Sequence, residues 1–120
     1  MATPRASSFS AKKCRPCEGG TAPLGREQAV SYLKEVPGWR LSADEKAIFI
    51  EYRMKHFLAA VDLIDRIAKV AEAEGHHPDF HLTGYRDLRI ELSTHSIGGL
   101  SENDFILAAK IQELPKTLKN

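Results

Sequence analysis

Residues 72–95, EAEGHHPDFHLTGYRDLRIELSTH, contain the end of a helix, two strands and the turn between them. Over residues 87–93, leucine and isoleucine alternate with polar residues, which is typical of a strand with one buried face. A shorter strand is predicted over residues 80–83, and the turn around Gly84 makes the two strands an antiparallel hairpin. Gly75 marks the end of the preceding helix, because glycine is common just past a helix C-terminus. This stretch predicts a helix that packs against a sheet.

Upstream of it, residues 56–73 have the period of an amphipathic helix, the longest in the chain. Its predicted buried stripe consists of Phe57, Ala60, Val61, Ile64, Ala68 and Ala71. Residues 47–54 alternate like a strand with one buried side, and a short strand over residues 39–42 precedes them. A first helix is predicted over residues 26–36, with Ala29, Val30, Leu33 and Val36 on its apolar side.

A last helix follows Ser101, which is a favourable N-cap residue. Asp104 stands three residues later and approximates a capping box, and Pro115 ends the helix. The predicted order is therefore α-β-β-α-β-β-α. Paired short strands with intervening helices predict an α+β fold of two layers, a four-stranded antiparallel sheet with helices on one face.

The composition is that of an ordinary globular domain. The chain has 120 residues, 42% of them hydrophobic and 28% charged, with a formal net charge of +1. This charge gives no reason to expect a nucleic-acid partner, and no apolar run is long enough to predict a membrane span. An intracellular protein is expected, with the cytoplasm favoured and a mitochondrion or plastid as alternatives.

Residues 1–20 differ from the rest, being basic, rich in serine and poor in large apolar side chains. Such a segment buries too little surface to offset its ordering entropy, so a mostly mobile tail is predicted before a domain over residues 21–120. The tail has the composition of an organelle transit peptide, and an ordinary tail is an equal alternative. Cys14 and Cys17 have the spacing of half a zinc site or of a redox pair. A reduced pair of minor function is the favoured interpretation, because no second Cys-x-x-Cys supplies the missing ligands.

Three histidines are predicted to lie together at element ends. His76 and His77 follow the long helix, Pro78 restricts His77 to extended conformations, and His95 follows the second strand of the hairpin. Imidazole exchanges protons near neutral pH, so this group suits general acid–base catalysis. Glu72, one helical turn before His76, is close enough to orient an imidazole. A metal site is the less favoured alternative, since adjacent histidines rarely converge on one ion, and no metal or other cofactor is expected.

The combination of these motifs resembles the pterin-4a-carbinolamine dehydratase family. The motifs are Glu72-x-x-x-His76-His77-Pro78, the strand ending in Thr94-His95, and Gly99-Leu-Ser-x-x-Asp104. The resemblance covers Leu24 to Leu114, and details such as the upstream Cys-x-Pro-Cys are most similar to plant and protist members. It implies a pterin substrate, with His76 and His95 as the proton-transfer pair and His77 as the substrate-binding histidine. Further positions around the pterin are implied at Trp39, Glu72, Pro78, Thr94, Ser96, Ile97 and Asp104.

The resemblance implies dehydration of a 4a-hydroxytetrahydropterin to the quinonoid dihydropterin, which recycles the cofactor of aromatic amino acid hydroxylases. It also implies homodimers or homotetramers. Animal members have an aspartate directly before the two histidines, where this chain has Gly75, so Glu72 or Glu74 is expected to supply the charge near His76. The alternative is a non-catalytic assembly or dimerisation cofactor on the same scaffold. Retention of all three histidines favours the enzyme.

Overall fold

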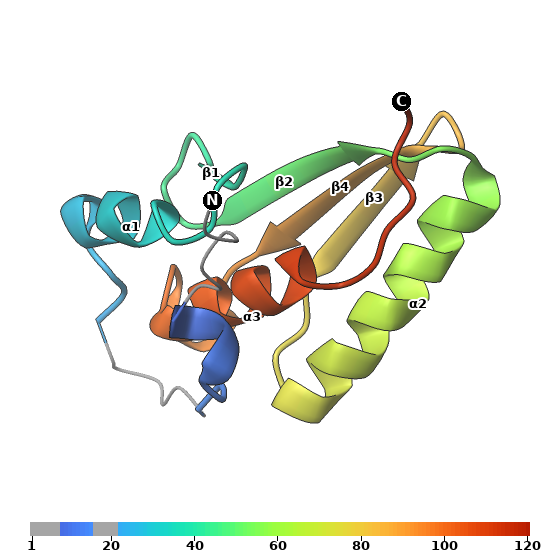
Figure 1. The fold of residues 1–120 in the computed structure, drawn as a ribbon. Helices are drawn as coiled ribbons and strands as arrows, with labels where there is room; N and C mark the ends of the chain where they lie inside the picture. The colour runs from blue at the N-terminus through green and yellow to red at the C-terminus, as the bar shows by residue number, and fades with distance from the viewer. Residues whose placement is uncertain (1–7, 16–21) are drawn as a thin grey trace, which may run out of the picture.

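The computed structural model describes residues 8–15 and 22–120, which form an α+β domain (Figure 1). A four-stranded antiparallel sheet has the order β1-β2-β4-β3. Its strands are β1 (Arg40–Leu41), β2 (Ile48–Arg53), β3 (Asp79–Thr83) and β4 (Asp87–Leu92). The α-helices are α1 (Arg26–Leu33), α2 (Phe57–Glu74) and α3 (Glu102–Gln112), and short 3-10 turns are η1 (Ser8–Ala11) and η2 (His95–Ile97). The predicted fold class and element order are confirmed.

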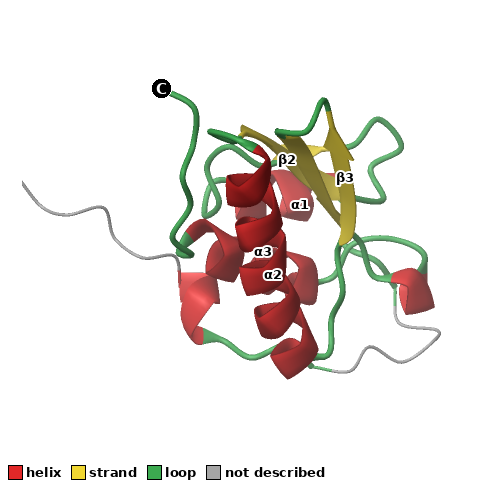
Figure 2. Cartoon of the chain, turned by 90° about the vertical axis from the view of Figure 1, so that its right-hand side faces the viewer, coloured by secondary structure: helices red, strands yellow, loops and turns green. Residues whose placement is uncertain are grey.

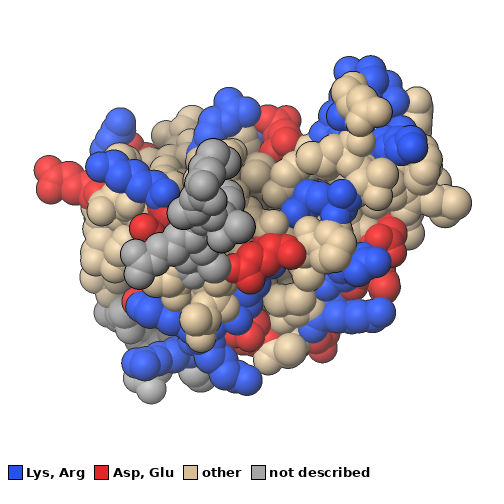
Figure 3. Space-filling view, in the orientation of Figure 1, with Lys and Arg blue, Asp and Glu red and all other residues tan. Residues whose placement is uncertain are grey.

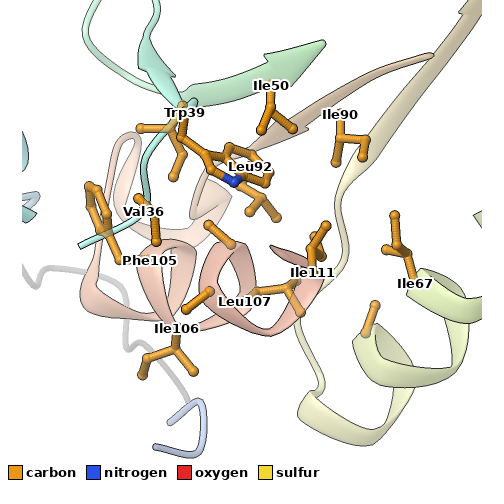
Figure 4. Close-up of a cluster of buried hydrophobic side chains, with 14 of the residues drawn as sticks. Val36, Trp39, Ile50, Ile67, Ile90, Leu92, Phe105, Ile106, Leu107 and Ile111 are labelled. Carbon is orange, nitrogen blue, oxygen red and sulfur yellow. The ribbon is translucent and has the colours of Figure 1, made fainter. Parts of the chain in front are cut away.

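Helices α2 and α3 contact each other and lie on one side of the sheet, below the strands in Figure 1, and Figure 2 views them with α2 in front. The facing side of the sheet is apolar because alternate residues of β2 and β4 point the same way. Fully buried side chains on these strands are Ile48, Leu88, Ile90 and Leu92. The core cluster in Figure 4 joins this face to α2 through Ile67 and to α3 through Leu107 and Ile111.

The buried stripe of α2 differs in part from the predicted one. Ala60 and Ala71 are buried as expected, but Phe57 and Val61 are 51% and 41% exposed. The buried face is completed by Leu63 and Ile67. Helix α2 carries apolar residues on more than one face, so periodicity alone did not show which face meets the sheet. Helix α1 is also shorter than predicted: Val36 is buried, but it lies in the turn beyond Leu33.

Two predicted helix ends are confirmed, the C-terminus of α2 and the N-terminus of α3. Gly75 adopts the left-handed conformation, with φ of 66°, and its N–H reaches the last turn of α2. At the start of α3, the Ser101 side chain and the Asp104 carboxylate form the complete capping box. Gly75 directly precedes His76, and Asp104 lies in the first turn of α3. Both His76 and Asp104 belong to the candidate site described below.

Part of the N-terminal segment packs onto the domain. Phe9 is 5% exposed, and its ring lies 5.0 Å from that of Tyr32 and 6.1 Å from that of Phe105, measured between centroids. Composition predicts a mostly mobile tail over residues 1–20, but the buried Phe9 ring and hydrogen bonds to Glu74, Asn103 and Lys110 hold residues 8–15 against the domain. The domain boundary at residue 20 stays a prediction.

Basic and acidic side chains are interspersed on the face shown in Figure 3, in keeping with the net charge of +1. Within the described residues, none of the helices combines the length and apolar character that crossing a membrane requires.

Candidate active site

A cavity of about 580 Å³ lies at the end of the sheet where β3 begins and β4 ends. Its lining includes all three predicted histidines. Antiparallel pairing explains why they meet: Asp79, the first residue of β3, is paired with Glu91 near the end of β4. Residues just before β3 and just after β4 therefore lie at the same end of the sheet. The lining consists of Cys14, Arg15, Glu72, Ala73, Glu74, Gly75, His76, His77, Ser93, Thr94, His95, Ser96 and Asn103.

His76 is held by a buried carboxylate. Its Nε2 lies 2.6 Å from Oδ1 of Asp104, which is fully buried, whereas the His76 side chain is 12% exposed. The other carboxylate oxygen, Oδ2, accepts from the Thr94 hydroxyl at 2.9 Å and from the Ser101 backbone N–H at 3.0 Å. Asp104 therefore caps α3 and orients His76 with the same side chain.

This arrangement fixes the tautomer of His76. A carboxylate is an acceptor only, so Nε2 carries the hydrogen in the bond to Asp104. Nδ1 is then the nitrogen of His76 that can exchange a proton with a bound molecule. Any proton transfer by His76 is therefore assigned to Nδ1.

His77 has a different carboxylate partner. Its Nε2 lies 2.6 Å from Oε1 of Glu72, and both side chains are mostly exposed. An ion pair this exposed adds little to stability. The contact instead orients the His77 ring, which Glu72 holds at the rim of the cavity.

The expectation that Glu72 or Glu74 supplies the charge beside His76 is wrong. Asp104 makes that contact. Glu74 instead accepts the Cys14 backbone N–H at 2.8 Å and lies 3.8 Å from Nζ of Lys110. Burial acts to raise the pKa of Glu74, but the Cys14 N–H and the Lys110 ammonium outweigh it and lower that pKa.

The Cys14 thiol is in a poor environment for a metal ligand. Burial, with the nearby Glu74 carboxylate, raises the pKa of Cys14 to about 12. Zinc binds the thiolate, so this environment disfavours the alternative in which Cys14 is a zinc ligand. Cys17 lies outside the described residues. Within the described ranges, no three His, Cys, Asp or Glu side chains are arranged to hold a metal ion.

The amino-acid sequence was compared with protein families and with known proteins. The family model "Pterin 4 alpha carbinolamine dehydratase" matches residues 22–114. The chain belongs to this family. Within the family, a protein of Halorhodospira halophila named "Putative pterin-4-alpha-carbinolamine dehydratase" is 46% identical over 107 residues, which cover 89% of this chain and 97% of the relative.

A plant member of the pterin carbinolamine dehydratase family is equally similar. "Pterin-4-alpha-carbinolamine dehydratase 2, mitochondrial" of Arabidopsis thaliana is 47% identical over 111 residues, covering 90% of this chain and 59% of that protein. The crystal structure of a "transcriptional coactivator/pterin dehydratase" from Brucella melitensis has a TM-score of 0.70 and 28% identity. The match covers 75% of this chain and 95% of that one. Bacterial and plant relatives match about equally, so the likeness to plant and protist members stays a prediction.

Six of the ten site residues predicted from the dehydratase family line the cavity, namely Glu72, His76, His77, Thr94, His95 and Ser96. The others lie behind or beside it. Pro78 links His77 to β3, and Ile97 is half-buried in η2. Asp104 has no exposed surface and acts through His76 and Thr94. Trp39 belongs to the core, where Figure 4 places it beside Ile50 and Leu92.

Residues of the N-terminal segment are a part of this site that sequence reasoning missed. Cys14 and Arg15 line the cavity, together with Asn103, which directly precedes Asp104. The basic, serine-rich composition of residues 1–20 carries no signal of this role. The burial of Phe9 and the backbone hydrogen bonds of Cys14 to Glu74 and of Arg15 to Asn103 hold the segment close to the site.

Trp39→Phe tests whether Trp39 serves the core or the substrate. The indole Nε1 is buried without a hydrogen-bond partner among the described residues. Phenylalanine lacks this N–H, so the substitution removes the cost of burying an unpaired donor, about 1–3 kcal/mol. This gain offsets the apolar contact that the smaller ring loses. We expect an unfolding free energy and a KM close to those of the parent, measured by urea unfolding and steady-state kinetics. A large rise in KM with an unchanged unfolding free energy would instead show that the indole binds substrate.

Proposed function

We propose that the protein dehydrates a 4a-hydroxytetrahydropterin to the quinonoid dihydropterin and water. The observation that carries this proposal is the convergence of His76, His77 and His95 on one cavity, with His76 oriented by buried Asp104. Membership of the dehydratase family supports the same reaction. The chemistry needs proton transfer and substrate orientation, which these side chains can supply.

In the reaction, the bond between C4a and the hydroxyl oxygen breaks, and the hydroxyl leaves as water after receiving a proton. N5 loses its hydrogen as a proton, and the electron pair of the N5–H bond forms the double bond between N5 and C4a. One proton is therefore donated and one is accepted, so no net proton is consumed. His76, through Nδ1, and His95 are the proposed proton-transfer pair, and His77 binds the substrate.

The function is tested by supplying the intact protein with 4a-hydroxytetrahydropterin generated by an aromatic amino acid hydroxylase. We expect the protein to shorten the lifetime of the carbinolamine, followed by its ultraviolet absorbance. We also propose a hydroxylase of this class as the physiological source of the substrate. Loss of the carbinolamine at the solvent rate, with folded protein present, would contradict the proposal.

A second candidate function is a non-catalytic assembly or dimerisation cofactor. The observation that favours it is the similarity to the Brucella protein, whose name gives "transcriptional coactivator" beside "pterin dehydratase". A folded chain that binds a protein partner but does not accelerate dehydration would support this alternative.

The proposal includes a homodimer or homotetramer. Its support is an exposed apolar strip at the start of α2, where Phe57, Leu58 and Val61 are 51%, 72% and 41% exposed. We expect Leu58→Glu to lower the mass measured by light scattering after gel filtration. An intact chain that runs as a monomer would contradict it. For the compartment, the mitochondrial name of the Arabidopsis relative gives one candidate beside the cytoplasm.

A further inference from the structure

The segment Ser8–Arg15 is tied to both elements that position His76. The Cys14 N–H donates to Glu74, the last residue of α2, at 2.8 Å. The Arg15 N–H donates to Oδ1 of Asn103 at 2.9 Å, and the Asn103 amide nitrogen donates back to the Arg15 carbonyl oxygen. Asn103 thus clamps the Arg15 backbone at two points. Its neighbour in the chain, Asp104, holds His76.

Further contacts fix the outer part of the segment. Phe9 is buried against Tyr32 and Phe105, and the Lys110 ammonium donates to the Ser10 carbonyl oxygen at 2.9 Å. The segment precedes the region matched by the family model, which begins at residue 22.

The segment Ser8–Arg15 reaches the substrate cavity. Cys14, Arg15 and Asn103 line it, and they also line a second cavity of about 610 Å³. These three residues are thus shared by two adjoining cavities. Among the described residues that line the first cavity, Arg15 alone carries a permanent positive charge.

We propose that this segment completes the pterin site and that Arg15 binds the pterin ring through its C4 carbonyl oxygen. A pterin presents that oxygen as an acceptor, and guanidinium is a donor that stays charged at every working pH. The inference rests on the proposed pterin substrate. Because the C4 carbonyl is present in both substrate and product, Arg15 is a binding residue whose loss raises KM and leaves kcat nearly unchanged.

The test measures binding of 7,8-dihydrobiopterin by calorimetry and turnover by steady-state kinetics, using the full chain. Arg15→Ala is expected to raise Kd and KM by about 10- to 100-fold, the effect of losing a charged hydrogen bond. Arg15→Lys should restore part of the affinity, since it keeps the charge but not the planar donor pair. The control is Arg66→Ala on the exposed side of α2, where Arg66 pairs with Asp62. It removes the same charge away from the cavity and should change neither constant.

Asn103→Ala tests the clamp, with thermal unfolding to confirm that the variant is folded. It should raise Kd in the parent chain but have little further effect in the Arg15→Ala background, because both changes remove the same contact. Fully additive effects would overturn the clamp. An unchanged Kd in Arg15→Ala would overturn the binding role of Arg15.

Failure of this inference is distinguishable from failure of the proposed function. Normal binding and turnover by Arg15→Ala contradict the role of Arg15 alone. An intact chain that binds dihydrobiopterin without dehydrating the carbinolamine contradicts the function, while the Kd series still decides about Arg15. An intact chain that binds no pterin contradicts both.

Discussion

His76→Ala and His95→Ala are each expected to lower kcat by about 10²–10⁴-fold, the usual contribution of a positioned general acid or base. Both imidazoles line the cavity, and each variant removes one site of proton exchange without removing His77. His77→Ala should mainly raise KM. The measurement is steady-state dehydration at saturating substrate, with near-ultraviolet circular dichroism to confirm the fold.

His81→Ala is the matched control for these variants. His81 is an exposed histidine of β3, 3.8 Å from Glu91, and does not line the cavity. Its replacement should leave kcat unchanged. Parent-like turnover in both His76→Ala and His95→Ala would contradict the assigned roles.

Asp104→Asn is the second change with a large expected effect, because it acts on stability and catalysis together. Three donors point at the carboxylate, from His76, Thr94 and Ser101, and an amide can accept from only some of them. We expect the unfolding free energy to fall by about 1–3 kcal/mol. Turnover should fall by about 10- to 100-fold, which corresponds to one charged hydrogen bond.

Ser101→Ala separates these two effects. The Ser101 hydroxyl accepts the Asn103 N–H, so its loss weakens the cap of α3 by about 0.5–2 kcal/mol. The bond between Asp104 and His76 remains. This variant should be less stable but retain kcat. If Ser101→Ala and Asp104→Asn lose turnover equally, Asp104 acts only through the helix cap.

The local parts of this structure were predictable from the sequence. Alternation in β4, the left-handed Gly75 and the capping box of α3 each depend on residues close in the chain. The meeting of His76 and His77 with His95 was also predictable, because a hairpin returns its two ends to the same edge of the sheet.

Contacts between distant segments were not predictable in the same way. The partner of His76 is Asp104, 28 residues away, and no periodicity distinguishes it from the nearer Glu72. Trp39 could have served the core or a ligand, and only its 4% exposure assigns it to the core. Arg15 lies in a segment whose composition predicts mobility, and the contacts that place it at the cavity, with Asn103 and through the buried ring of Phe9, join residues far apart in the chain.

The most direct test of the central claim is a stopped-flow measurement of 4a-hydroxytetrahydropterin decay with protein in excess. The intact chain and the double variant His76→Ala/His95→Ala are compared with buffer alone. We predict fast exponential decay with the intact chain and a rate at least about 10²-fold lower with the folded double variant. Equal decay with the intact chain and the double variant would contradict histidine acid–base catalysis, and decay no faster than in buffer would contradict dehydratase function itself.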